Sequence, residues 1–283
     1  MLKEVFAHAQ NKGFAFGAFN VCNLETIKAV VQAAQNLSSP VIIESSPGET
    51  KFIGMRQLTA LIKSYREEIN LPIFLNLDHA ASFSSCEEAV EIGFDLVHFD
   101  GSKLPLEENI KQTHEVVKMA HSKGILVEGE IDAIPETSIP HSKTAEEITQ
   151  DLPMTDPISA AEFVEKTGID ILAFFVGNLH GTYETAERID FERLKKIREK
   201  VNCFLSLHGG SGIADEDIRK AITVGKIVKV NVNTELRVAF RNALERALAE
   251  SQSVKVYEVM PGVINEVQKI VEKKIGLFGL VIA

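Results

Sequence analysis

The sequence has few cysteines, and they are scattered. Cys22, Cys86 and Cys203 are the three cysteines among 283 residues, and no two of them have CxxC spacing. An odd number of widely spaced cysteines argues against a disulfide framework and against a cysteine-rich zinc module. This usage is typical of a reducing compartment, and we expect the protein to be cytoplasmic.

Positive charge and long apolar runs are also scarce. The formal net charge is −10 at pH 7 and the isoelectric point is about 5.4, which makes nucleic acid and anionic membranes poor partners. Residues 1–14 lack the apolar centre of a signal peptide. The apolar run 275–283 is too short to span a bilayer. We therefore expect neither nucleic acid nor a membrane as a partner.

The sequence does contain a regular alternation of apolar runs and helical patterns. With 45% hydrophobic and 25% charged residues, it has an ordinary globular composition. The apolar runs predict strands at residues 14–21, 41–43, 73–79, 95–102, 125–131, 171–177, 203–209 and 227–232. Amphipathic stretches predict helices at about 24–35, 55–65, 84–92, 104–124, 158–168, 190–200, 215–224, 234–250 and 263–274.

Strands that alternate with helices in this way predict an α/β fold, a single-domain (β/α)8 TIM barrel over residues 1–283. A doubly wound sheet is the alternative, but GxGxxG is absent after the first strand. Residues 45–48 are predicted to be a loop. Residues 132–156 lack a core pattern and are expected to form an active-site loop. The domain is expected to end in C-terminal helices.

Polar side chains lie at or just past the carboxyl ends of these strands, which share one rim in a (β/α)8 barrel. The set is Asp78, His79, Asp100, Glu130, His180, His208 and Asn231. Three of them, His79, His180 and His208, could form a three-nitrogen metal site with an open fourth position if the fold brings them together. Of the other histidines, His98 is interpreted as a packing residue. The rest, His8, His114, His121 and His141, are interpreted as surface residues.

Two carboxylates have both a structural and a chemical interpretation. Asp78 could cap the next helix, or it could act as an acid or base beside a metal. Glu130 lies in a predicted buried strand, where a lone carboxylate is costly, so it is expected to bind a metal or form an ion pair. Glu128 points to the same face by the two-residue period of a strand and is a candidate companion.

The stretch Gly209-Gly210-Ser211-Gly212 follows a predicted strand directly. It could be a simple tight turn. Backbone N–H groups and a hydroxyl at this place could also converge on a phosphate, as loops seven and eight of such barrels often do. We favour a phosphate site.

The ordered motifs along the chain resemble the class II, metal-dependent fructose-bisphosphate aldolases, including their tagatose-bisphosphate branch. The motifs are GAFNV at 17–21, SPVIIESSPGE at 39–49, LDH at 77–79, FDGSKLPLEENI at 99–110, VEGEI at 127–131, TDPISAAEFVEKTGID at 155–170, GNLHGTY at 177–183, LHGGSGIADEDI at 207–218 and KVNVNTELRVAF at 229–240. The resemblance covers nearly the whole chain.

The resemblance implies retro-aldol cleavage of a phosphorylated ketose to dihydroxyacetone phosphate and an aldehyde, through a metal-stabilised enediolate. It implies Zn2+, or another divalent ion, on His79, His180 and His208, with Glu130 as a further or alternative ligand. Asp78 would be the acid/base group, and Asn231 would contact the enediolate. The implied substrate and phosphate contacts are Asn20, Ser46, Gly181, Gly209, Gly210, Ser211, Asn231, Asn233, Thr234 and Arg237. Arg237 matches an arginine that some members use for the far phosphate. A monovalent cation, Na+ or K+, is also implied.

The chain departs from the family after the fifth strand. It reads EIDAIPETSIPHSK, where the family usually has a leucine and a glycine-rich acidic loop that carries a proton-transferring carboxylate. Glu136 is the first candidate for that carboxylate here, and Asp132 is the second. Position 184 is Glu where many members have Lys. Asp132 and Glu184 would make the rim more acidic, which disfavours a standard bisphosphate.

Several interpretations therefore stay open. The substrate could be fructose 1,6-bisphosphate, tagatose 1,6-bisphosphate, a related sugar acid or another sugar phosphate. A non-catalytic barrel that binds a phosphorylated metabolite is an alternative, and a Schiff-base aldolase would have to use Lys229, the only lysine found in a predicted strand. The resemblance also implies a homodimer or homotetramer.

Overall fold

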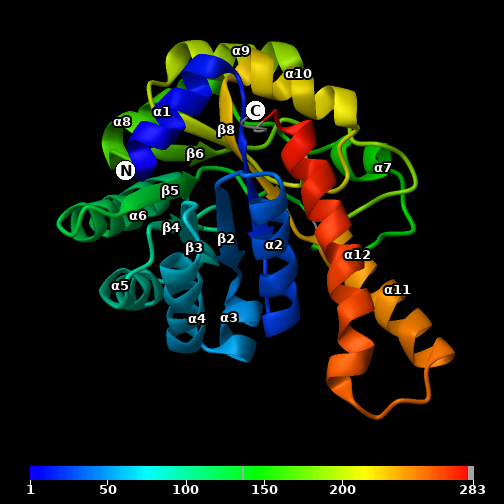
Figure 1. The fold of residues 1–283 in the computed structure, drawn as a ribbon. Helices are drawn as coiled ribbons and strands as arrows, with labels where there is room; N and C mark the ends of the chain where they lie inside the picture. The colour runs from blue at the N-terminus through cyan, green and yellow to red at the C-terminus, as the bar shows by residue number, and fades with distance from the viewer. Residues whose placement is uncertain (136, 280–283) are drawn as a thin grey trace.

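Eight parallel strands form a closed barrel in a computed structural model that describes residues 1–135 and 137–279 (Figure 1). The strands are β1 (Phe16–Asn20), β2 (Val41–Ser45), β3 (Ile73–Ala80), β4 (Leu96–Phe99), β5 (Leu126–Glu130), β6 (Ile171–Ala173), β7 (Phe204–Leu207) and β8 (Ile227–Val232). Each strand pairs with the next, and β8 pairs with β1. The prediction of a single-domain (β/α)8 TIM barrel is confirmed.

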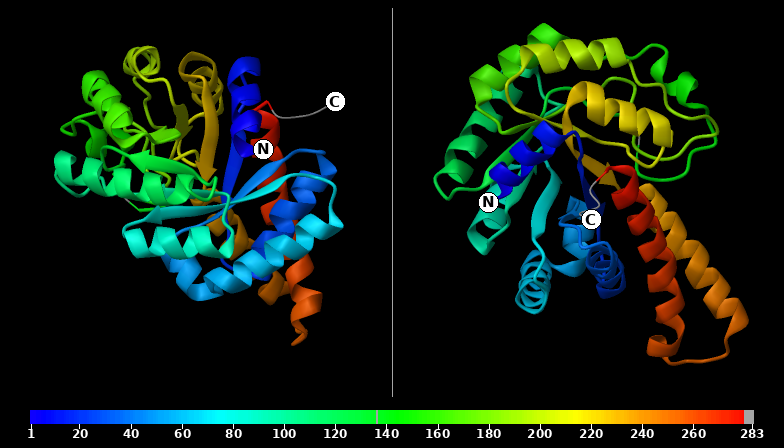
Figure 2. Two further views of the ribbon diagram at one scale, coloured as in Figure 1. Left: turned by 90° about the vertical axis from the view of Figure 1, so that its left-hand side faces the viewer. Right: turned by 45° about the horizontal axis from the view of Figure 1, so that its top comes forward.

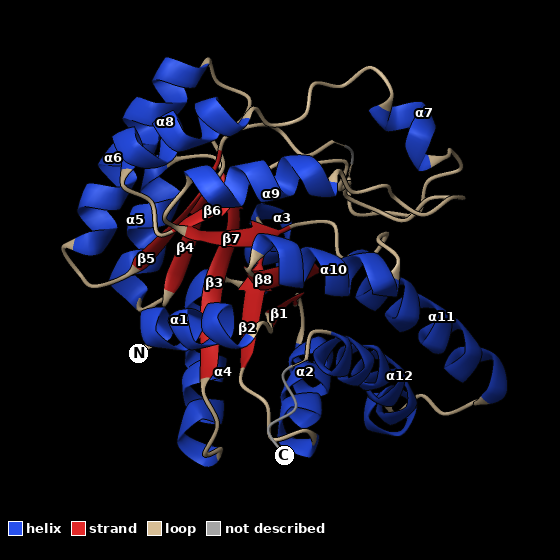
Figure 3. Cartoon of the chain, turned by 90° about the horizontal axis from the view of Figure 1, so that it is seen from above, coloured by secondary structure: helices blue, strands red, loops and turns tan. Residues whose placement is uncertain are grey.

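Helices surround the barrel on the outside, as the view in Figure 3 shows. They are α1 (Leu2–Lys12), α2 (Leu24–Asn36), α3 (Pro47–Ile53), α4 (Met55–Glu68), α5 (Phe83–Ile92), α6 (Leu106–His121), α7 (Ala145–Thr149), α8 (Pro157–Thr167), α9 (Phe191–Lys200), α10 (Asp215–Gly225), α11 (Thr234–Glu250) and α12 (Val256–Leu277). Local sequence sets their ends. Asn23 and Thr26 form a capping box at the start of α2, and Gly168 ends α8 in the left-handed conformation.

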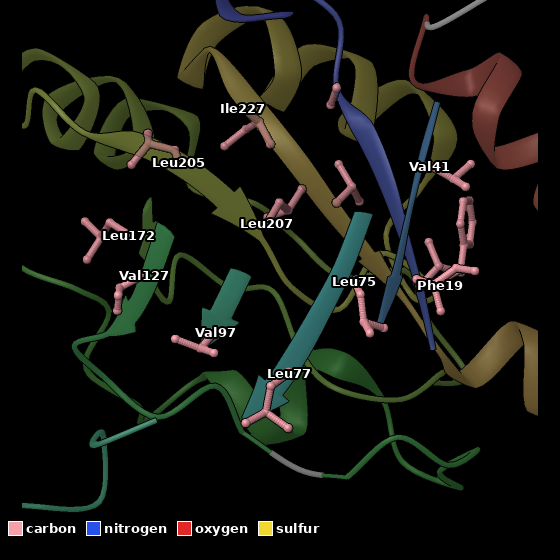
Figure 4. Close-up of a cluster of buried hydrophobic side chains, with 14 of the residues drawn as sticks. Phe19, Val41, Leu75, Leu77, Val97, Val127, Leu172, Leu205, Leu207 and Ile227 are labelled. Carbon is pink, nitrogen blue, oxygen red and sulfur yellow. The ribbon is translucent and has the colours of Figure 1, made fainter. Parts of the chain in front are cut away.

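The apolar core lies mainly between the barrel and its helices. Side chains such as Leu75, Val97, Val127, Leu172 and Leu205 lie on the successive strands β3 to β7 within this core (Figure 4). Because side chains alternate along a strand, the residues next to them in sequence point into the barrel.

The residues that point inward form layers. The layer nearest the amino-terminal ends of the strands is apolar. It comprises Phe16, Ala18, Ile42, Phe74, Leu96, Leu126, Ile171 and Val228. Helix α1 closes this end, where Phe6 packs edge-on against Phe16 and Phe204 at centroid distances of 5.9 and 5.6 Å. The next layer is buried and polar, and it comprises Glu44, Asn76, His98, Glu128, Ser206 and Lys229. Two residues further along the strands come the polar groups of the rim.

The structure corrects several sequence predictions. Pro47 and Gly48, predicted to lie in a loop, instead begin α3, and α12 begins at Val256 rather than near Val263. Strand β6 ends at Ala173 because other groups take its later backbone hydrogen bonds: the Asn178 side chain bonds Val176 N–H and the carbonyl of Phe174. Helix α1 was not predicted from the sequence. It packs across one end of the barrel and does not follow a strand.

Two segments extend from the compact barrel. The stretch after β5 contains α7 and packs on the rim through a small apolar cluster that includes Ile134, Ala145 and Phe175. Helices α11 and α12 form a long hairpin that projects to one side (Figure 2). Within the described residues, no helix is long and apolar enough to cross a membrane.

Candidate active site

The end of β3 places Asp78 and His79 side by side at an irregularity in the sheet. The pairing of β3 with β4 shifts register between Leu77 and Ala80, which marks a β-bulge. His79 lies in this bulge with φ at 49°, a conformation that is unfavourable for a residue other than glycine. Strained backbone of this kind is typical of functional sites. The bulge lets two consecutive side chains face the same rim.

Four imidazole rings meet at this rim. The ring centroid of His79 lies 4.5 Å from that of His98, 4.9 Å from that of His208 and 5.0 Å from that of His180. The rings come from β3, β4, the end of β7 and the loop after β6. The fold therefore brings His79, His180 and His208 together.

The structure corrects the interpretation of His98 as a packing residue. It is completely buried, but it faces acids and other histidines rather than apolar side chains. Its Nδ1 accepts a hydrogen bond from the backbone N–H of His79 at 3.2 Å, and its Nε2 lies 3.3 Å from Glu130 Oε2. A sequence signal existed: His98 and Asp100 are two residues apart on one strand face, like Glu128 and Glu130. Residues 98 and 128 are also paired in register.

The donors around these rings fit a divalent cation. Nitrogen and carboxylate oxygen atoms of Asp78, His79, His98 and His208 lie within 4.8 Å of one another. The same holds for His79, Asp100 and Glu130. These are ligand types that Zn2+ accepts. His180 belongs to neither of these two groups.

Within the described residues, two buried atoms of this cluster are among those that lack a hydrogen-bond partner. They are His98 Nε2 and Glu130 Oε2, which face each other across 3.3 Å. Buried polar atoms are normally satisfied, so this pair is consistent with a bound cation.

The charges of the site shift its pKa values in opposite directions. Burial by itself raises the pKa of Asp78, but the charge of His79 and the contact with His98 outweigh burial and hold this pKa well below its usual range. Burial, followed by repulsion from His79 and His208, lowers the pKa of His180 far below its usual range. Asp78 is therefore a carboxylate, and His180 is a neutral imidazole with a lone pair to donate.

The glycine loop after β7 is built for a close backbone approach. Gly209 has φ at 77°, and a Cβ atom there would lie 2.0 Å from the carbonyl oxygen of Leu179. Gly181 has φ at 119° and faces residues 139 and 141 of the loop after β5. The carbonyl of Gly210 accepts a hydrogen bond from the buried Lys274 of α12 at 2.8 Å. Larger residues would not fit at positions 181 and 209.

Three of the histidines, His79, His180 and His208, share one cavity of about 280 Å3 with the glycine loop. The predicted site residues that line it are Asn20, Ser46, Asp78, His79, Glu130, His180, Gly181, His208, Gly209, Ser211, Asn231, Asn233, Thr234 and Arg237. Gly210 lies behind this lining, with its N–H on the carbonyl of Asn231. Glu136 lies outside the described residues. Asp132 hydrogen-bonds to Thr155 and does not line the cavity.

A comparison with known families agrees with this arrangement. The family model described as fructose-bisphosphate aldolase class-II matches residues 1–281. The chain belongs to this family. It is therefore an aldolase, a carbon–carbon lyase of a metal-dependent family.

Solved structures of class II aldolases resemble this one along their whole length. The YdjI aldolase from Escherichia coli K12 is 33% identical, with a TM-score of 0.85, and the match covers 99% of this chain and 97% of that one. A candidate fructose-1,6-bisphosphate aldolase from Coccidioides immitis is 31% identical, with a TM-score of 0.84, and the match covers 98% and 96%. Fructose-bisphosphate aldolase from Campylobacter jejuni shares the fold at 22% identity, with a TM-score of 0.82 over 99% and 94%.

Membership of class II agrees with the state of Lys229, the residue that a Schiff-base enzyme would have to use. Its Nζ lies 2.9 Å from Glu128 Oε2 and donates to Asn231 Oδ1 at 2.7 Å. Burial opposes its charge, but Glu128 and Glu44 outweigh burial and raise its pKa above the usual value. A Schiff-base lysine needs a lowered pKa, whereas Lys229 is a buried cation paired with two carboxylates.

Proposed function

We propose that this protein is a Zn2+-dependent aldolase that cleaves a phosphorylated ketose to dihydroxyacetone phosphate and an aldehyde. The observation that carries the proposal is the meeting of the histidine and carboxylate cluster with the glycine loop in one cavity. His79, His180 and His208 would hold the ion, with Glu130 as a further or alternative ligand. Such an ion would act as a Lewis acid toward the negative charge that develops on the ketone oxygen.

The residues around the cluster support this reaction. Asp78 takes the proton of the hydroxyl beside the bond to be cleaved, that bond breaks, and its electron pair stays on the three-carbon fragment, which then takes up a proton at carbon. Asp78 is held by two amides: Asn20 Nδ2 at 3.1 Å and Asn231 Nδ2 at 3.3 Å. Lys229 donates to the amide oxygen of Asn231. The Asn231 N–H groups therefore face Asp78.

The glycine loop would bind the phosphate of the three-carbon half. Gly181 and Gly209 line the cavity, where their backbone N–H groups could donate to an anion. Ser211, Asn233 and Thr234 would add polar contacts from the same corner. Binding energy from this end positions the reacting carbons at the metal cluster.

The proposal is tested by the release of dihydroxyacetone phosphate from fructose 1,6-bisphosphate, tagatose 1,6-bisphosphate and the corresponding ketose 1-phosphates. Activity with Zn2+ that disappears after EDTA treatment and returns with added Zn2+ supports it. His208→Ala is expected to lose bound metal and activity together. Metal content that is unchanged in this variant would contradict the ligand assignment.

We also propose a monovalent cation, Na+ or K+, beside the phosphate corner. Support comes from Glu187, a buried carboxylate near Gly212 whose Oε1 has no hydrogen-bond partner among the described residues. Activity should fall when K+ and Na+ are replaced by tetramethylammonium at constant ionic strength. Equal activity in all three salts would speak against this cation.

A homodimer or homotetramer completes the proposal. The turn between α11 and α12 and the start of α12 expose apolar side chains, among them Val254, Val256 and Tyr257. An apolar surface of this kind is typical of contact sites. Sedimentation velocity at micromolar concentration should show an oligomer. A monomer at that concentration would refute this part.

A further inference from the structure

Glu49 is a buried carboxylate at the edge of the cavity that has no role in the reaction described above. It lies on α3 and its side chain is 8% exposed. Its Oε2 accepts hydrogen bonds from Asn20 Nδ2 at 2.9 Å and from both the backbone N–H and the hydroxyl of Ser46 at 2.8 Å. Asn20 and Ser46 both line the cavity.

The other oxygen of Glu49 engages the opposite side of the same corner. Oε1 pairs with the Arg237 guanidinium at 2.6 Å and lies 3.4 Å from Asn233 Nδ2. The Glu49 carboxylate thus pairs with one cation and accepts from a hydroxyl, a backbone N–H and two side-chain amides. That is the set of donors that would bind a phosphate or another anionic end group of a ligand.

A purely structural explanation covers only part of this network. Ser46 and Glu49 form the capping box of α3, which accounts for the hydrogen bonds to Ser46. Asn20 ends β1 and Arg237 lies on α11, and neither belongs to that helix end. Arg237 is held from a third side, because its Nη1 donates to the carbonyl of Ser138 in the loop after β5 at 3.0 Å.

The pairing removes the attraction that a second phosphate would need. Among the described residues, the carboxylates that line the cavity are Asp78, Asp100 and Glu130, and the side-chain cations other than histidine are Lys103 and Arg237. Arg237 is already neutralised by Glu49. A phosphate brings about two further negative charges at neutral pH, and here they would lie beside a buried carboxylate.

We propose that Glu49 is a specificity-determining residue that excludes a second phosphate. The substrate class is then a ketose 1-phosphate whose far end carries hydroxyl groups, and the aldehyde product is uncharged. Hydroxyl groups can donate to Glu49 and accept from Arg237, so this end group keeps the network satisfied. This inference rests on the proposed aldolase function and narrows its substrate.

The test uses the reverse reaction, because two aldehydes of equal length form a matched pair. Dihydroxyacetone phosphate is offered with D- or L-glyceraldehyde, or with the corresponding glyceraldehyde 3-phosphate, and kcat/KM is measured for each. The exchange of the C3 protons of dihydroxyacetone phosphate with deuterated water is followed separately by NMR, because it needs no aldehyde. All assays use the Zn2+-loaded protein.

The wild type should prefer glyceraldehyde over its phosphate by about tenfold or more. Glu49→Gln frees Arg237, and it should shift this ratio by about tenfold toward the phosphorylated aldehyde. Adding Arg237→Gln should remove that gain. Glu49→Asp keeps the charge and should keep the preference. Glu67→Gln removes one exposed negative charge from α4 and should leave the ratio unchanged.

Binding gives a readout that does not depend on turnover. By calorimetry, the Glu49→Gln variant should gain about tenfold in affinity for hexitol 1,6-bisphosphate, with little change for hexitol 1-phosphate. Circular dichroism confirms that each variant is folded. If Glu49→Gln does not fold, the wild-type preference still tests the substrate class, and Glu49→Ala replaces Glu49→Gln in the test of Glu49.

Three results would overturn the inference in different ways. A wild type that prefers glyceraldehyde 3-phosphate shows that Arg237 leaves Glu49 for the substrate. An unchanged ratio in folded Glu49→Gln shows that Glu49 does not set specificity. Both leave the proposed function intact if proton exchange occurs. If Zn2+-loaded wild type shows no exchange, the proposed function fails and this inference fails with it.

Discussion

Replacing Lys229 by Met tests whether the buried polar layer below the rim is held together by one cation. The Lys229 Nζ lies 2.9 Å from Glu128 Oε2 and 3.5 Å from Glu44 Oε2, and all three side chains are fully buried. Removing one partner of a buried pair costs about 3–5 kcal/mol, because a charge is left without compensation. We expect Lys229→Met to lower the free energy of unfolding by about 3–5 kcal/mol at pH 7.5.

The same substitution should also reduce activity. Lys229 donates to Asn231 Oδ1, and without this hydrogen bond the Asn231 amide can rotate away from Asp78. Equilibrium urea unfolding, followed by circular dichroism, measures the change in stability. Lys195→Met on α9 removes an exposed lysine and should change stability by less than about 0.5 kcal/mol.

A loss below about 1 kcal/mol in Lys229→Met would refute the reasoning, because the carboxylates would then not depend on this cation. Borohydride treatment during turnover gives an independent check. Covalent trapping of substrate on Lys229 in the wild type would mean that this lysine is a nucleophile and that its role as a buried cation is wrong.

Three further predictions concern the rim. Gly209→Ala should lower the free energy of unfolding by more than about 2 kcal/mol, because φ is positive and the carbonyl of Leu179 blocks the new Cβ. In the control Gly48→Ala, the new Cβ meets no atom within 4 Å, so this variant should be neutral in thermal unfolding. His98→Ala should weaken metal binding by about tenfold or more in a chelator titration, and unchanged affinity would remove His98 from the metal centre. In protein free of Na+ and K+, burial raises the pKa of Glu187 well above 4.5. The folded state then binds the extra proton, so stability should fall as pH rises above 4.5. Glu187→Gln should flatten this dependence of Tm on pH, and an unaltered slope would contradict the assignment.

The sequence by itself determined the architecture and most of the rim. Alternation of apolar runs and amphipathic stretches is a local property, so all the barrel strands were found within a few residues of their ends. Residues such as His79, His208 and Asn231 could be predicted because they directly follow apolar runs, and parallel strands in a barrel end on one rim. The family motifs then supplied roles that spacing alone leaves open.

Only the tertiary structure decided which inward-facing groups meet. His98 and Lys229 are both interior strand residues in the sequence pattern. The register of β4 against β5 sets His98 beside the Glu128–Glu130 stretch, and closure of the barrel brings Lys229 of β8 to Glu128 of β5 and Glu44 of β2. The network of Glu49 joins residues 29 and 188 positions apart in the chain. Local periodicity tells which face of a strand a side chain occupies, but closure of the barrel determines which other faces it meets. The charge balance of the site therefore depends on the closed barrel and cannot be read from any single segment.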